Sequence, residues 1–248
     1  YAAGADYLRT LPPKADRGAA GGVVVLGLDQ TDWNGRSDLN ELRRMFADYF
    51  GLACRNDPQG RYRLEELRSA RLLLAASPAA LPLAEAAQAL WGVPVCRGLP
   101  YGVRGSARLV ESVSRLLEQA PSPAWSADRR EAEQAVREFQ FALRPWPKRE
   151  LRLCVRPERA ACLASFLSGE LKLSVSTPPE HAFLTQPPAG AVLLGSGILC
   201  RLYPQHPSLC LDTPVLHQQL FSTHLPFAGI RGTANLLSAL YPLLTEDV

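Results

Sequence analysis

The sequence predicts an α/β protein made of two Rossmann-like parallel-sheet domains joined by a long helix. Short apolar runs, such as residues 23–27 and 71–76, alternate with amphipathic segments of helical length. Such runs are typical of strands buried on both faces, and the alternation implies parallel pairing with right-handed crossovers. The alternation stops at Pro121 and restarts after a long polar segment. We therefore expect a tail of a preceding domain or a linker over residues 1–21, a first domain over 22–120, a bridging helix within 121–148, and a second, smaller domain over 149–248 with a C-terminal helix.

The elements of the first domain follow one another in a regular order. Ser37 suits the N-cap of a helix whose apolar face includes Leu39 and Phe46, and Gly51 closes that helix. Gly92 stops a second apolar helix in the same way. The predicted strands cover residues 23–27, 52–54, 71–76 and 93–96, and the helices between and after them cover 37–50, 64–70, 83–91 and 103–119.

The bridging helix and the second domain continue the pattern. Ser126 suits the N-cap of a polar helix over residues 127–143, and Arg144 suits the negative end of its dipole. Pro157 is well placed to begin the next helix, and the closing helix is expected after Gly232. The predicted strands of the second domain cover residues 151–155, 171–176, 189–194 and 208–211, and its last helix covers 233–244.

Composition excludes several classes of protein. The chain has 248 residues, 47% of them hydrophobic, and a formal charge of +3 with both signs interspersed, which does not indicate nucleic-acid binding. No apolar stretch approaches the roughly 20 residues of a membrane span. The six cysteines form no C-x-x-C pair, and reduced thiols of a cytoplasmic protein are the expected interpretation. The chain begins at Tyr1 rather than Met, so we expect further sequence upstream.

Several motifs together resemble one known family. They are the turn Phe50-Gly-Leu52, the segments Leu90-Trp-Gly-Val-Pro94 and Pro100-Tyr-Gly102, the strand and loop Ala191-Val-Leu-Leu-Gly-Ser-Gly197, the segment Thr213-Pro-Val215, and the closing Pro226-Phe-Ala-Gly-Ile-Arg-Gly232. In order and spacing they are similar to nitrogenase component 1-type oxidoreductases whose N-terminal domain is missing.

The resemblance implies a fold of Rossmann-like domains and a set of partners. Proteins of this type pair with a homologous component 1 subunit, as a homo- or hetero-oligomer, and accept electrons from an ATP-dependent iron–sulfur reductase. They reduce a bound substrate or serve as a scaffold for assembling a metal cofactor. An iron–sulfur cluster is expected only in the full-length protein or its complex, and no cofactor is assigned with certainty to this chain.

The chain departs from the family pattern where catalytic members bind their large cofactor. The stretch matching the cofactor cysteine is Ala75-Ala-Ser-Pro78, and Ser77 is a poor substitute for a thiolate. The cofactor histidine lies before the final turn in the family. Here that loop holds His217 and His224, neither of which falls on the matching position. We therefore expect that this chain alone is not catalytic and holds no iron–sulfur cluster.

Candidate site residues gather where strands end, because ligands of open α/β sheets bind in the crevice outside the carboxyl ends of the strands. Gly195 and Ser196 follow a buried strand and could cradle an anion, although such a G-x-G is more often a simple turn. Cys96 lies beside Arg97, which favours a lowered thiol pKa, although packing is the simpler role. The full candidate set for cofactor binding is Ser77, Cys96, Arg97, Arg104, Gly195, Ser196, His217, His224, Gly229 and Arg231. No metal ligand is assigned.

A second hypothesis belongs to a different class. Two α/β domains joined by a long helix also describe metal-chelate binding proteins of transport type. No Walker loop, H-E-x-x-H motif or Ser-His-Asp order is present in the sequence, so nucleotide-binding and hydrolase hypotheses have no support.

Overall fold

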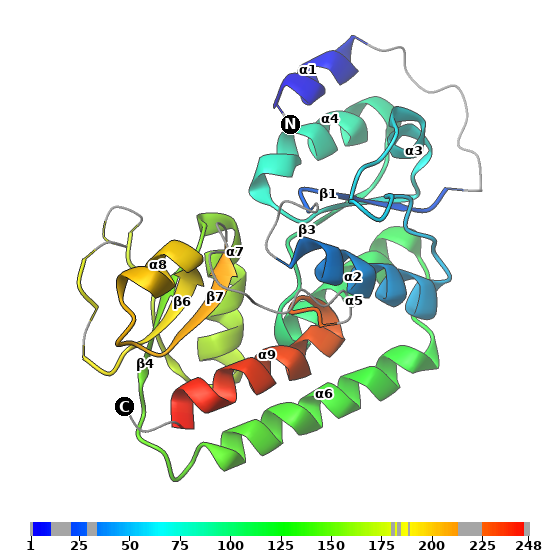
Figure 1. Cartoon of the computed structure of the whole chain (residues 1–248). Helices are drawn as coiled ribbons and strands as arrows, with labels where there is room; N and C mark the ends of the chain where they lie inside the picture. The colour runs from blue at the N-terminus through cyan, green and yellow to red at the C-terminus, as the bar shows by residue number, and fades with distance from the viewer. Residues whose placement is uncertain are drawn as a thin grey trace.

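A computed structural model gives the architecture of the chain and describes residues 2–10, 21–28, 34–179, 182, 185–187, 189–212 and 225–245. Two parallel sheets lie in separate lobes, with the helices α6 and α9 running side by side below them (Figure 1). The prediction of an α/β protein with two parallel sheets and a long connecting helix is confirmed.

The first sheet has the order β1-β2-β3, and all its strands are parallel. The strands are β1 (Val23–Leu26), β2 (Leu72–Ala75) and β3 (Val95–Arg97). Val23 and Val25 face one apolar cluster, which includes residues of α2 (Gly35–Phe50) and α5 (Gly102–Leu117). Val24 and Leu26 face a second cluster with α3 (Leu64–Ser69) and α4 (Leu81–Trp91), the latter preceded by the short 3-10 turn η1 (Pro78–Ala80). The sheet is therefore buried on both faces, as continuous apolar strands require.

The strand expected at residues 52–54 is reduced to one parallel bridge between Val23 and Cys54. An asparagine side chain takes its place beside β1. The Asn56 side chain accepts from Val25 N and donates to Val25 O, both at 2.8 Å. Backbone pairing with β1 ends at Arg55, whose N–H donates to the carbonyl oxygen of Val23 at 2.8 Å, and the Asn56 side chain continues the edge at Val25.

The first residues of the chain include a short helix. Residues Ala2–Arg9 form the helix α1, which packs on α4 and buries Ala5 and Leu8 in the second cluster. Within the segment expected to be a tail of a preceding domain or a linker, residues 2–9 are therefore helical and packed on the first domain. Residues 11–20 lie outside the described part of the chain.

The second sheet has the order β5-β4-β6-β7 and is also parallel. Its strands are β4 (Glu150–Cys154), β5 (Ser174–Ser176), β6 (Val192–Ser196) and β7 (Ser208–Asp212). The helix α7 (Pro157–Ala164) follows β4 and continues as the π-helical segment η2 (Ser165–Glu170). The short helix α8 (Gly197–Leu202) follows β6.

Three helix starts differ from the prediction. The N-cap of α2 is Asn34 in the left-handed conformation, not Ser37. The N-cap of α6 (Pro123–Ala142) is Ser122, followed by Pro123 at the first helical position, so Ser126 lies within the helix. The helix α9 (Gly229–Thr245) begins at Gly229 rather than after Gly232. In each case the helix extends toward a tertiary contact that local periodicity does not report.

Candidate interdomain site

The carboxyl ends of the strands of both sheets carry several of the predicted residues. Ser77 lies after β2 and before η1, with its hydroxyl against Gly27, where a Cβ would overlap Ser77 Oγ. Gly27 has a φ of 79°, so this close approach depends on glycine. Ser77 therefore packs against the end of β1 in the first domain.

The Gly195-Ser196 segment is the end of β6 and the N-cap of α8. Ser196 Oγ accepts from Leu199 N at 3.5 Å. A Cβ on Gly195 would lie 2.8 Å from the carbonyl oxygen of Cys154, so glycine allows β6 to approach β4 here. The space beside Gly195, where an anion was expected to approach the backbone, is therefore occupied by β4.

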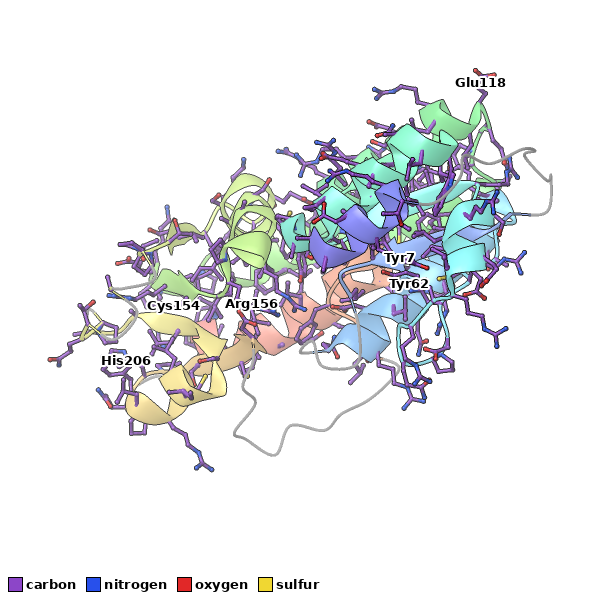
Figure 2. The ribbon with its side chains drawn as sticks, turned by 90° about the horizontal axis from the view of Figure 1, so that it is seen from above. Tyr7, Tyr62, Glu118, Cys154, Arg156 and His206 are labelled. Carbon is purple, nitrogen blue, oxygen red and sulfur yellow. The ribbon has the colours of Figure 1, made fainter. Side chains whose placement is uncertain are left out.

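An ion pair that the sequence analysis missed lies at the same edge of the second sheet. Asp212, at the end of β7, accepts from Arg156 N at 2.6 Å and from Arg156 Nε at 2.8 Å. The Asp212 side chain is 4% exposed and the Arg156 side chain 46%. Figure 2 shows Arg156 on the side of the second domain that faces the first, with His206 at the far side. The available signal was an acid at the end of one buried strand and a basic residue just after another.

A cleft of about 400 Å³ lies between the first domain and α7, and two of the predicted residues line it. Cys96 and Arg97 come from β3, and Ala161 and Cys162 come from α7. Arg97 Nη2 also contacts Glu85 Oε1 at 2.9 Å. Burial raises the pKa of Cys96 to about 11, so the expectation of a lowered pKa beside Arg97 is wrong. Desolvation disfavours the thiolate, and Cys96 is a packing residue that is neutral at pH 7.

Arg104 does not line this cleft. Its backbone N–H and that of Val103 donate to Glu170 of η2, at 3.0 and 2.9 Å. Its guanidinium lies 3.5 Å from the carbonyl oxygen of Gly169. Glu170 therefore satisfies the first turn of α5 from the other domain, as an N-cap carboxylate would. A Cβ on Gly102 would lie 2.6 Å from Glu170 Oε1, which is why this cap requires glycine.

Gly229 and Arg231 lie at the start of α9, which packs on α2. Asp38 accepts from the N–H groups of Phe227 and Ala228 at 2.8 and 2.9 Å, and Glu41 accepts from that of Arg231 at 3.1 Å. Gly229 has a φ of 81°, and a Cβ there would overlap Glu41 Cγ. The glycine-rich turn therefore lets carboxylates of α2 reach the free N–H groups of α9. Arg231 lines a second cavity, of about 480 Å³, between α6 and α9.

The buried Asp38 carboxylate is only partly satisfied. Its Oδ1 takes the two backbone bonds and one from Asn34, while Oδ2 has no hydrogen-bond partner. Burial raises the pKa of Asp38 to about 6, against the lowering effect of the Arg159 charge and the two backbone N–H groups. The remaining predicted residues, His217 and His224, lie outside the described residues.

The described residues do not fit an iron–sulfur cluster. No group of three or more His, Cys, Asp or Glu side chains among them could hold a metal ion. The six cysteines are free thiols on separate elements, whereas clusters are held by convergent thiolates. Burial raises the pKa of each of these thiols, which opposes the deprotonation that metal binding needs. Of the helices within the described ranges, none is both long and apolar enough to cross a membrane.

Comparisons with known proteins identify a family and a similar fold. A family model for nitrogenase component 1-type oxidoreductases matches residues 2–177. A solved structure described as "Nitrogenase Cp1 at pH 6.5" is similar, with a TM-score of 0.70 and 12% identity, over 98% of this chain and 64% of that one. The chain thus spans less than two thirds of that protein and shares its fold. No curated protein sequence matches. Because the family model covers well over half of its residues, the chain belongs to the nitrogenase component 1-type oxidoreductase family.

Proposed function

We propose that this chain is all or part of a nitrogenase-like component 1 subunit. It acts in the cytoplasm with a second subunit of the same type and an ATP-dependent iron–sulfur reductase. The family match over residues 2–177 supports this role, and it is the reason for preferring it to a chelate-binding transport protein.

Within that role, we infer that the described residues of this chain supply no cluster ligand. The observation that supports this inference is the stretch at the end of β2. Catalytic relatives have a cysteine there, whereas this chain has Ala75-Ala-Ser-Pro78. Ser77 is turned toward Gly27 within its own domain. The role that remains is that of a scaffold in cofactor assembly, a non-catalytic paired subunit, or a reductase acting on a different substrate.

Two measurements test the two parts separately. The first is anaerobic reconstitution of residues 1–248 with iron and sulfide, followed by iron analysis and visible absorption. No stoichiometric cluster is expected, and a cluster that disappears when one cysteine is replaced by serine would refute the ligand assignment.

The second measurement concerns the subunit role. The full-length protein, purified anaerobically from its native cells, should carry a second component 1-type chain at fixed stoichiometry. It should also accept electrons from an iron–sulfur reductase only when ATP is present. A protein that is monomeric at all concentrations and is never reduced by such a reductase would rule out the subunit role, whatever the reconstitution shows.

A further inference from the structure

The cleft between α5 and α7 is built by both domains. Its floor is formed by small or uncharged residues of α5, Gly105, Leu109 and Ser112. The opposite wall is Ala161, Cys162 and Ser165 of α7 and η2. Its volume of about 400 Å³ lies in the range of small-molecule sites. Cys96 and Arg97, at the end of β3, line it, whereas Ser77, Gly195 and Ser196, at the ends of β2 and β6, do not.

The charge of the cleft is positive. Arg97 and Arg108 line it, and no acidic side chain is among its described lining residues. Arg97 is engaged by Glu85, whereas no described side chain forms an ion pair with Arg108, which is exposed at the rim. The charge of Arg108 favours the ionised form of Glu170, whose two carboxylate oxygens already accept the N–H groups of α5. A concave wall of low dielectric concentrates the field of such a cation.

The remaining surface of the cleft does not oppose an anion. Burial is the main influence on Cys162 and raises its pKa, although Arg108 and the N–H of Leu99 favour the thiolate. With the pKa of Cys96 at about 11, both thiols are neutral at pH 7. Gly98 has a φ of 90°, and no heavy atom lies within 4 Å of where its Cβ would be. Gly98 therefore leaves space for a ligand, while its own N–H donates to the carbonyl oxygen of Ala75 at 2.8 Å.

We propose that the cleft between α5 and α7 binds a small oxyanion, a phosphate or a carboxylate, held by the Arg108 guanidinium. The ligand contacts both domains, because the walls of the cleft come from both. This site lies at the carboxyl end of β3 and does not depend on the role proposed for the whole subunit.

Protection of Cys162 from alkylation reports occupancy of this cleft. The chain is treated with iodoacetamide at rising concentrations of inorganic phosphate, with sodium chloride matching the ionic strength, and each cysteine is quantified by peptide mass spectrometry. Phosphate should slow the alkylation of Cys162 saturably. It should leave unchanged that of Cys54, which is also half-buried but lies beside β1. Acetate in a parallel series shows whether a carboxylate is accepted as well as a phosphate.

Matched variants assign the effect to the cleft. Arg108→Gln should weaken phosphate protection by at least about tenfold, the loss expected for one charge-assisted contact. Arg115→Gln, an exposed arginine two turns along α5 that does not line the cleft, should have no effect. Ala161→Phe narrows the cleft without changing its charge and should weaken phosphate binding measured by calorimetry. No saturable protection by either anion, or equal protection in the Arg108→Gln variant, would overturn the proposal.

Discussion

Glu170 of the second domain accepts a 2.9 Å hydrogen bond from the backbone N–H of Val103, which begins the last helix of the first domain. The two residues are separated by 67 positions in the sequence, and Gln140 of α6 donates to the carbonyl oxygen of Glu170 at 2.7 Å. The carboxylate of Glu170 thus connects η2 to α5, and its backbone carbonyl connects η2 to α6.

Replacing this carboxylate should weaken the junction between the domains. Glu170→Ala leaves one buried N–H group, of Val103, and one partly buried N–H group, of Arg104, without acceptors, which costs about 1–3 kcal/mol of unfolding free energy. Glu170→Gln keeps an acceptor oxygen and should cost less. Urea unfolding measures both, with Glu111→Ala, on the exposed face of α5, as the control. Equal midpoints for Glu170→Ala and Glu111→Ala would show that the cap contributes nothing.

Asp38 should make stability depend on pH between about 4 and 6. Burial raises its pKa in the folded chain to about 6, above the value of about 3.9 in an unfolded chain. The folded state therefore holds the proton more tightly, and its contribution is present at low pH and lost as pH rises through about 6. The difference corresponds to about 3 kcal/mol of unfolding free energy.

The Asp38→Asn variant isolates this effect. Its amide oxygen can still accept from Phe227 and Ala228, and it carries no charge to desolvate. Urea unfolding at pH 4.5, 5.5 and 7.5 should show wild-type stability falling relative to the variant as pH rises. Parallel profiles for the two proteins would contradict the assignment.

Gly229→Ala should lower the free energy of unfolding more than Gly51→Ala does, although both glycines have a positive φ. Gly51 has a φ of 65° with nothing within 4 Å of a Cβ, whereas a Cβ on Gly229 would overlap Glu41 Cγ. Gly51→Ala should cost about 1 kcal/mol from its left-handed conformation. Gly229→Ala should cost about 3 kcal/mol, because overpacking adds to the strain. Thermal unfolding of the two variants measures the difference in stability. Equal losses of stability would mean that the Glu41 side chain moves away at no cost.

Arg44 connects α2 to α6 through Asp128. Arg44 Nη1 and the Tyr49 hydroxyl both donate to Asp128 Oδ2, at 2.7 and 2.6 Å. Asp128→Ala removes the acceptor of both and should cost about 2 kcal/mol. Glu133→Ala breaks only an exposed pair with Arg129 on the same helix and should cost less than about 0.5 kcal/mol.

A double-mutant cycle with Tyr49→Phe then separates the hydroxyl from the guanidinium. A measurable coupling energy between Tyr49→Phe and Asp128→Ala is expected, because the two side chains share one hydrogen bond. Additive losses would show that Arg44 alone accounts for the effect of Asp128.

The sequence by itself determined the elements whose signal is local. Val23 to Leu26 and Leu72 to Ala75 are continuous apolar runs, and they form central strands buried on both faces. Gly51 and Gly92 end their helices as expected, both with a positive φ. These features follow from the conformational freedom of single residues and from short periodic patterns.

Only the tertiary structure decided what the polar residues and the last glycines do. Asn56 replaces a strand partner of β1, and Glu170 and Glu41 cap helices that lie far away in sequence. Gly229 lets a carboxylate of α2 approach, which a motif read along the chain does not reveal. Cys96 has a raised pKa because its side chain is buried. Burial and long-range hydrogen bonds depend on which elements pack together, and no local pattern records that.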